Sequence, residues 1–141
     1  MANVLFVCLH NAGRSQMSQA LFQRAADGRH RAQSAGTTPA HAVHPEVVEV
    51  MREVALDLSD RRPRKLTAEL AAGADVMVTM GCGDECPYFP GKRYIDWDLP
   101  DPRGGPLDDV RELRDEIEAR VTALVDELDR QQAAVRGHPS I

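Results

Sequence analysis

The sequence predicts a three-layer α/β/α fold, in which helices cover both faces of a central four-stranded parallel sheet. Short apolar runs alternate along the chain with segments whose apolar residues recur at helical spacing. Such alternation is typical of βαβ units, which build parallel sheets buried on both faces. The chain has 141 residues, 43% of them hydrophobic, which suits one domain with one core. We expect that domain to occupy residues 1–136, followed by a frayed tail at 137–141.

Strands are expected in four places. Residues 3–8 and 76–80 are continuous apolar runs of the length of a buried strand, and residues 31–34 and 93–97 give weaker strand signals. The carboxyl ends of parallel strands meet at one edge of the sheet, and ligands bind beyond that edge. The loops that follow these strands should therefore converge, although they lie far apart in the sequence.

Helical spacing predicts four helices, at residues 14–26, 45–54, 66–72 and 107–128. Gly28 supplies a stop for the first helix, and Pro45 fits the first turn of the second. The last helix gives the strongest signal, because apolar residues follow one side of it and dense charge follows the other. Prolines and glycines between residues 100 and 106 exclude regular structure before it.

The segment from Cys8 to Ser15 has the most informative spacing in the chain. Cys8 ends the first apolar run, five residues follow, and Arg14-Ser15 opens the first helical pattern. A strand that turns directly into a helix points consecutive backbone N–H groups into one small bowl at the positive end of the helix dipole. The planar guanidinium of Arg14 matches two oxygens of an oxyanion, and a thiol beside these amides should ionise easily. The residues expected to bind the oxyanion are Leu9, His10, Asn11, Ala12, Gly13 and Arg14.

A lone buried cysteine is usually an inert small hydrophobe, but this context favours a nucleophilic Cys8. Asp101 supplies a second candidate, because it follows the strand signal at 93–97 and stands between Pro100 and Pro102. An aspartate beside proline is commonly a turn residue. Its place at the carboxyl end of a strand favours instead a general acid that faces Cys8 and protonates a leaving oxygen.

The loop after residue 80 carries the other two cysteines, Cys82 and Cys86. An odd number of cysteines does not indicate a disulfide framework, which leaves catalysis, redox exchange or metal binding. Glycines on both sides of Cys82 permit the movement that thiol exchange requires, so the redox interpretation is favoured. We expect no metal and no cofactor, because no tight ligand spacing links the cysteines to the candidate histidines His10, His41 and His44.

The overall charge restricts the kinds of partner. A net charge of −5 argues against general affinity for nucleic acids. The basic run at residues 61–65 is an exception, which we interpret as a solvated or anion-steering surface loop. No secretion signal and no segment apolar enough to span a bilayer are present, so we expect a cytoplasmic protein that does not contact membranes.

Taken together, these motifs resemble the thioredoxin-coupled arsenate reductases of the low-molecular-weight protein tyrosine phosphatase family. The matching segments span most of the chain, at residues 8–17, 34–36, 45–59, 78–82, 86–87, 97, 101–102 and 114–117. The Cys8 loop and the Asp101-Pro102 pair fit any member of that fold. Cys82 and Cys86 are the part of the resemblance that is specific to the reductases.

The resemblance implies a relay of three thiols. Cys8 would form a thiol–arsenate adduct, and Cys82 would attack Cys8 with release of arsenite. Cys86 would then capture Cys82, and thioredoxin would reduce the Cys82–Cys86 disulfide. Phosphate and sulfate would compete with arsenate for the same bowl.

The resemblance also implies supporting roles. Arg14 would bind the oxyanion, Ser15 would support the Cys8 thiolate by hydrogen bonding, and Asn11 would hold the conformation of the loop. Asp101 would protonate the departing oxygen. Members of the family suggest a monomer.

Two features depart from the family pattern. Only three residues separate Cys82 from Cys86, where relatives often have more. Residues four apart on a helix still lie near the Cα separation of about 4.4–6.8 Å that a disulfide needs. Some relatives bind an alkali cation beside the loop through acidic side chains, whereas this chain has Gln19 and Arg64 at those places, so we expect no such cation site.

Three other functions are weighed against arsenate reduction by this relay. A tyrosine phosphatase of the same fold usually carries aromatic residues after Asp-Pro, whereas residues 103–105 offer no ring platform, so only a weak phosphatase side activity is expected. A small thiol, mycothiol or glutathione, could resolve the Cys8 intermediate in place of Cys82. A non-catalytic arsenic or metal sensor would leave Arg14 and Asp101 unexplained.

Overall fold

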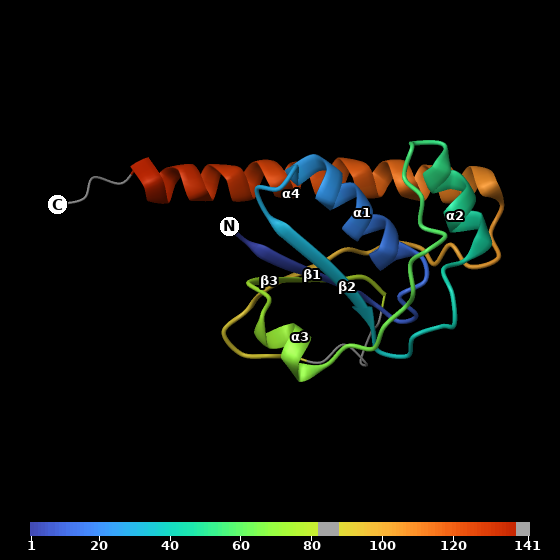
Figure 1. The fold of residues 1–141 in the computed structure, drawn as a ribbon, viewed down its shortest axis with the longest axis horizontal. Coiled ribbons are helices and arrows are strands. Elements are labelled where there is room, and N and C mark those ends of the chain that lie inside the picture. The colour runs from blue at the N-terminus through green and yellow to red at the C-terminus, as the bar shows by residue number, and fades with distance from the viewer. Residues whose placement is uncertain (82–87, 138–141) are drawn as a thin grey trace.

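The computed structural model describes residues 1–81 and 88–137, and it confirms the predicted fold class. Its four strands form one parallel sheet in the order β2-β1-β3-β4. The strands are β1 (Asn3–Cys8), β2 (Arg31–Gly36), β3 (Val76–Thr79) and β4 (Arg93–Asp96). The helices in the described part of the chain are α1 (Arg14–Ala26), α2 (Pro45–Arg52), α3 (Ala68–Ala72) and α4 (Leu107–Gly137). Helices α1 and α4 cover one face of the sheet, with α2 packed on α4, and α3 lies on the other face (Figure 1).

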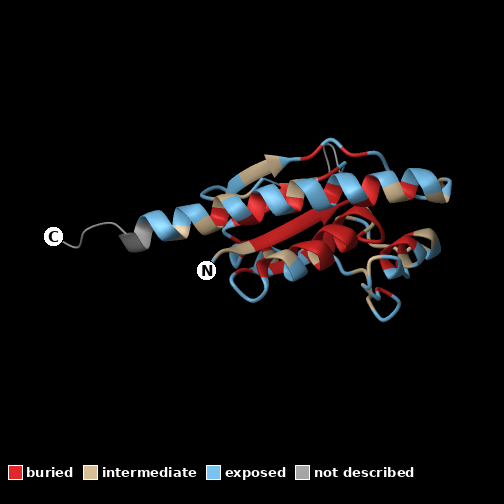
Figure 2. Ribbon diagram, turned by 90° about the horizontal axis from the view of Figure 1, so that it is seen from above, coloured by how far each residue is buried: buried red, intermediate tan, exposed pale blue. Residues whose placement is uncertain are grey.

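The central strand β1 divides the core in two. Its side chains alternate between the faces, so Phe6 and Cys8 belong to the larger cluster beneath α1 and α4, whereas Leu5 and Val7 belong to the smaller cluster beside α3. Phe6 is fully buried, and its ring centroid lies 5.7 Å from that of Phe22. Figure 2 shows the resulting burial, with the interior strands enclosed and only one stripe of α4 turned inward. The site must therefore be built from the loops at the rim of this sheet.

Helix α3 begins later than the sequence predicts. The apolar spacing places its start at Leu66, but the Leu66 amide donates to the Gly36 carbonyl at 2.9 Å and Lys65 forms a parallel bridge with Gly36. This pairing holds residues 65–66 extended beside the end of β2, which also runs on to Gly36. Thr67 then caps the helix by accepting from the Leu70 amide at 3.1 Å.

Helix α4 is longer than the sequence predicts. Its apolar stripe ends at Leu128, but the helix continues to Gly137. Asp129, the first residue beyond the stripe, accepts hydrogen bonds from Arg29 and from the buried imidazole of His30. These contacts attach the extension to the turn between α1 and β2, and the residues that follow are mostly good helix formers without a core-facing pattern.

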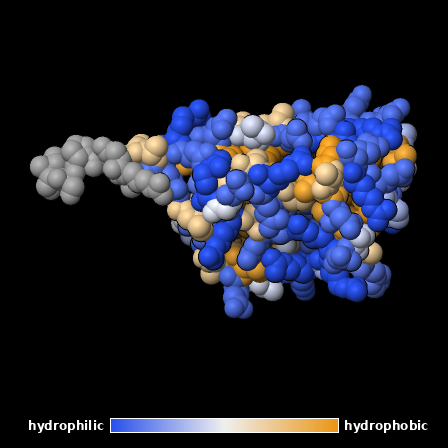
Figure 3. Space-filling model, turned by 45° about the horizontal axis from the view of Figure 1, so that its top comes forward, coloured by the Kyte–Doolittle hydropathy of each residue, from blue (hydrophilic) through white to orange (hydrophobic). Residues whose placement is uncertain are grey.

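The surface and the sheet edge define where function can lie. The face drawn in Figure 3 is mainly hydrophilic, with apolar side chains in scattered patches. In residues 1–81 and 88–137 no helix has the length and apolar character needed to cross a membrane.

At the carboxyl edge of the sheet, Cys8 of β1 pairs with Gly36 of β2, β3 ends beside β1, and β4 ends beside β3. The loops after β1, β3 and β4 leave the sheet at this edge, as expected.

Candidate active site

The loop between β1 and α1 turns its carbonyl groups outward. Four of these carbonyls accept hydrogen bonds of 2.8–3.3 Å from amides of residues 37–44. The donor–acceptor pairs are Thr37 with Cys8, Thr38 with Leu9, Ala40 with His10, and His44 with Ala12. In the part of the chain that the structure describes, no amide of residues 9–13 donates to a backbone carbonyl. These amides are therefore left available on the inner side of the loop, where an anion can bind.

Asn11 fixes the curvature of this loop. It is fully buried and has a φ of 50°, in the left-handed region that asparagine tolerates better than most residues. Its side-chain oxygen accepts from the Arg64 amide at 2.9 Å and from Gln16 Nε2 at 3.1 Å. Its Nδ2 donates to Ser15 Oγ at 2.7 Å. The predicted role of Asn11 as the residue that holds the loop fits these contacts.

Ser15 connects Asn11 to the candidate nucleophile. Cys8 and Ser15 are both buried, and the Cys8 sulfur lies 2.9 Å from Ser15 Oγ. Because Ser15 Oγ accepts the Asn11 hydrogen bond, its own proton is free to point at the Cys8 sulfur. A hydroxyl that donates to sulfur stabilises a thiolate more than a thiol. The thiolate is the form that acts as a nucleophile.

Arg14, the first residue of α1, lies beside the loop with its side chain almost buried. Its Nη1 donates to the Leu99 carbonyl at 3.1 Å, and its Nη2 lies 3.9 Å from the Asp101 carboxylate. Both partners come from the loop after β4. The structure therefore brings Cys8, Arg14, Ser15 and Asp101 together, as the sequence predicts.

The Asp101 loop is packed directly on the anion loop. Asp101 Oδ1 accepts from the Arg103 amide at 3.0 Å, while its side chain remains 45% exposed. Pro102 is buried against Gly13, where a Cβ atom would lie only 2.7 Å from the proline Cγ. The Gly104 amide donates to Glu46 of α2 at 2.8 Å, which ties the loop down on its other side. Asp101 is thus an accessible carboxyl group on a fixed support.

His44 is a site residue that the sequence alone did not assign to this chemistry. It caps α2, its amide bonds the Ala12 carbonyl, and its ring lies beside Gly13. Burial lowers the pKa of His44 below its ordinary value of 6.5, against the opposing influence of Glu46 and Asp101, and so favours the neutral imidazole. Pro45 after it marks a helix start, but only the folded chain shows that this start touches the anion loop.

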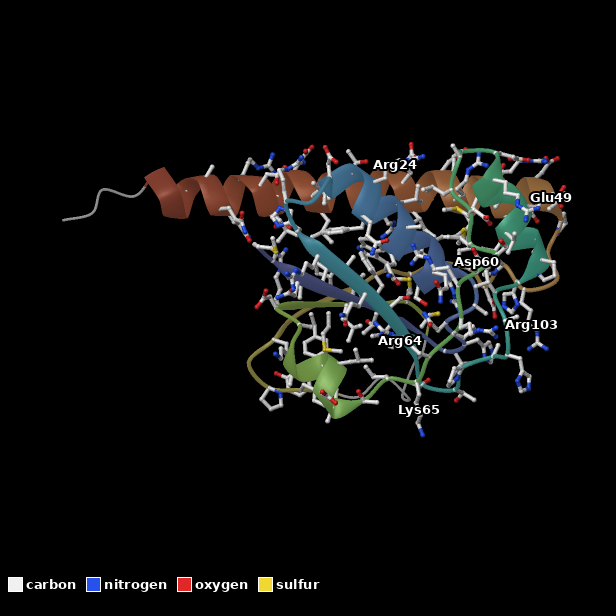
Figure 4. The ribbon with its side chains drawn as sticks, in the orientation of Figure 1. Arg24, Glu49, Asp60, Arg64, Lys65 and Arg103 are labelled. Carbon is white, nitrogen blue, oxygen red and sulfur yellow. The ribbon has the colours of Figure 1, made fainter. Side chains whose placement is uncertain are left out.

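Arg64 differs from the expectation for its basic segment. The run at residues 61–65 was interpreted as a solvated or anion-steering loop, but Arg64 Nε donates to the Ser34 carbonyl at 3.1 Å and its amide binds Asn11. Figure 4 shows Arg64 beside the carboxyl end of β2, whereas Lys65 projects away from it. Ser34 Oγ in turn donates to Gln19 Oε1 at 2.6 Å. Arg64 therefore stabilises the loop between β1 and α1 through its contacts with Asn11 and Ser34.

The remaining candidates are only partly placed. Cys82 and Cys86 lie outside the described residues, and Cys8 is a free thiol. The chain reaches Cys82 from the edge that carries Cys8, because β3 pairs with β1 and the Met80 amide donates to the Val7 carbonyl at 2.8 Å. Within residues 1–81 and 88–137, no group of three or more metal-ligating side chains is assembled.

Comparison with known proteins identifies the family that this fold and site define. The chain belongs to the low molecular weight phosphotyrosine protein phosphatase family, which it matches over residues 3–134. A putative arsenate reductase from Halobacterium salinarum is 44% identical to it over 129 residues, which are 88% of this chain and 91% of that protein. The resemblance seen in the sequence is confirmed at this level.

Two solved structures show how far the family extends. A thioredoxin-dependent arsenate reductase from Corynebacterium glutamicum is 38% identical, with a TM-score of 0.79 over 93% of this chain. This chain spans only 63% of the length of that one. An arginine phosphatase from Geobacillus stearothermophilus aligns over the full length of both chains, with a TM-score of 0.84 at 25% identity. Reductases and phosphatases thus share this fold.

Proposed function

We propose that the protein reduces arsenate to arsenite, with Cys8 as the nucleophile and with Cys82 and Cys86 passing the resulting disulfide to thioredoxin. The observation that carries the proposal is the Cys8 sulfur, 2.9 Å from the Ser15 hydroxyl, at the base of a loop in which the carbonyls of Cys8, Leu9, His10 and Ala12 are bonded to amides of residues 37–44. The names of the Halobacterium and Corynebacterium relatives supply the substrate and the electron donor. We further propose that it acts as a monomer in the reducing cytoplasm, where free thiols persist.

The first step is a substitution at arsenic. The Cys8 thiolate attacks arsenate while Arg14 and the loop amides hold the oxyanion oxygens. An S–As bond forms and an As–O bond breaks, and Asp101 donates the proton with which the departing oxygen leaves as water. Arsenic remains pentavalent in this adduct.

The second step transfers two electrons. The Cys82 thiolate attacks the Cys8 sulfur, so that an S–S bond forms, the S–As bond breaks, and its electron pair stays on arsenic, which leaves as trivalent arsenite. Cys86 then displaces Cys8 from Cys82, and the dithiol of thioredoxin reduces the Cys82–Cys86 disulfide while becoming oxidised itself. A phosphatase ends its reaction with water, so only the reductase requires these additional thiols.

A phosphatase is the second candidate, because the arginine phosphatase aligns over the whole chain and the Asp101 carboxylate, 3.9 Å from Arg14, would serve as general acid in either reaction. Cys82 and Cys86 argue against it as the main activity. Reduction resolved by mycothiol or glutathione is a variant of the first proposal, in which Cys82 and Cys86 stay reduced.

One experiment separates these functions. The purified protein is incubated with arsenate, thioredoxin, thioredoxin reductase and NADPH, and separately with an aryl phosphate. We expect arsenite formation matched by NADPH oxidation, little phosphate release, and neither product from Cys8→Ser. Arsenite formed only when glutathione or mycothiol replaces thioredoxin would reassign the electron donor, and phosphate release without arsenite would make the protein a phosphatase.

A further inference from the structure

The guanidinium of Arg14 rests on the backbone of Gly81. A Cβ atom at Gly81 would lie 2.1 Å from Arg14 Nη1, 2.9 Å from Cζ and 3.3 Å from Nη2. The φ of Gly81 is +79°, a conformation that residues with a side chain rarely adopt. Position 81 therefore excludes a side chain for two independent reasons: its positive φ would be strained, and a Cβ atom would clash with Arg14.

Among the described glycines with positive φ, only Gly81 makes such a contact. Gly28, Gly91 and Gly104 also have positive φ values, but a Cβ atom on any of them would have no neighbour within 4 Å. At these three positions, glycine is needed only for the backbone conformation. Gly81 in addition leaves the space that the guanidinium occupies.

Neither side of this contact can move away freely. Arg14 is 6% exposed, and Nη1, the atom that the Cβ would meet most closely, is the one bonded to the Leu99 carbonyl. On the other side, the Met80 side chain is fully buried and its amide is bonded to Val7 at 2.8 Å. A side chain at position 81 would therefore have to displace the guanidinium.

We propose that Gly81 is a positioning residue that sets the place of the Arg14 guanidinium for oxyanion binding; this inference rests on the proposed function. Its backbone forms the wall against which the planar fork lies, so the fork meets the substrate in one orientation. The residue acts through Arg14 and does not itself contact the oxyanion.

The test measures phosphate binding directly. Phosphate should protect Cys8 from iodoacetamide, and the labelled Cys8 peptide is quantified by mass spectrometry over a range of phosphate concentrations. We expect Gly81→Ala to weaken phosphate binding at least about tenfold, because hydrogen bonds to a charged group are lost. The control Gly91→Ala introduces the same backbone strain without the clash and should bind phosphate within about twofold of wild type.

A double-mutant cycle tests whether Gly81→Ala weakens phosphate binding by displacing the Arg14 guanidinium. Lysine lacks the guanidinium atoms that the Cβ would meet, so Gly81→Ala should cause little further loss in an Arg14→Lys background. If Gly81→Ala fails to fold by circular dichroism while Gly91→Ala, which carries the same backbone strain, folds, the Arg14→Lys change should restore folding. An additive loss, or no restoration, would show that Gly81 does not act through Arg14.

The outcomes also separate this inference from the function on which it rests. If phosphate protects Cys8 equally in wild type and Gly81→Ala, the positioning role is wrong while the oxyanion site stands. If phosphate protects neither, both proposals fail.

Discussion

Arg14 is held by groups from two loops that are distant in the sequence. The loop after β4 contributes the Leu99 carbonyl and the Asp101 carboxylate, and the loop after β3 contributes Gly81. In the proposed function, a guanidinium fixed in this way would present two parallel N–H groups to the oxyanion, whereas a lysine ammonium would present a single point charge.

Arg14→Lys should therefore lower kcat/KM for arsenate by about a hundredfold or more, which is the usual effect of losing a positioned donor to a developing charge. Phosphate and sulfate should compete with arsenate in the wild type and do so more weakly in the variant. Arg31→Lys, an exposed change near the opposite end of β2, is the control. Near-normal turnover by Arg14→Lys would reduce Arg14 to a structural charge.

Asp101→Asn should slow formation of the arsenate adduct by about a hundredfold, because the amide keeps the shape but has no acidic proton to donate. Single-turnover kinetics across the pH range in which arsenate becomes a dianion would measure this step. Asp98→Asn, an exposed change in the same loop, should leave the rate unaltered. Equal rates for both variants would return Asp101 to the status of a turn residue.

Individual site residues differ in how far the sequence predicts them. Cys8, Arg14 and Ser15 are predictable because their spacing along one strand–loop–helix segment fixes their relation. Asp101 is predictable from its place after a strand. Gly81 is not, because its importance lies in a contact with Arg14 that only the folded chain creates.

Helix α2 is clamped to α4 by one carboxylate. Arg111 donates to both oxygens of Glu53 at 2.8–3.0 Å, and Arg114 Nη1 adds a further bond of 2.8 Å. The amino end of α2 carries His44 and Glu46, which hold the two loops of the site. The clamp thus stabilises the element on which the active site is mounted.

The clamp predicts a pH dependence of stability. Hydrogen bonds from Arg111 and then Arg114 lower the pKa of Glu53 from its ordinary 4.5 to about 2. A carboxylate with a lowered pKa stabilises the fold above its unfolded-state pKa, and this contribution disappears as the pH falls toward the folded-state value. Glu53→Gln should therefore unfold at a lower temperature than wild type at pH 7, and the difference should shrink between pH 4.5 and 2.

Thermal unfolding followed by circular dichroism across this pH range measures the effect. Glu49→Gln lies on the same helix, at an exposed position labelled in Figure 4, and it serves as the matched control. A pH-independent difference between Glu53→Gln and wild type would contradict the assignment of the clamp to the charged carboxylate.

Whole elements are predicted well where apolar spacing decides them, as in β1 and α1. Their ends are predicted less well where a contact decides them. Residues 65–66 extend because they pair with Gly36, and α4 passes Leu128 because Asp129 binds Arg29 and His30 in the turn between α1 and β2. Neither partner is visible in the local pattern.

The order of the strands in the parallel sheet supports the proposed relay between cysteines that are distant in the sequence. Placing β1 between β2 and β3 brings the anion loop beside the chain that leads from β3 toward Cys82. The four-stranded sheet and the convergence of its carboxyl ends follow from alternating strand and helix signals. The strand order does not, because it depends on long-range pairing.

The most direct test of the disulfide relay maps thiols after one equivalent of arsenate, without a reductant. Alkylation and peptide mass spectrometry should find a Cys82–Cys86 disulfide, a free Cys8 and stoichiometric arsenite in the wild type. Cys86→Ser should stop after a single turnover as a Cys8–Cys82 disulfide. Arsenite release with no disulfide among the three cysteines, or normal thioredoxin-dependent turnover by Cys86→Ser, would contradict the relay.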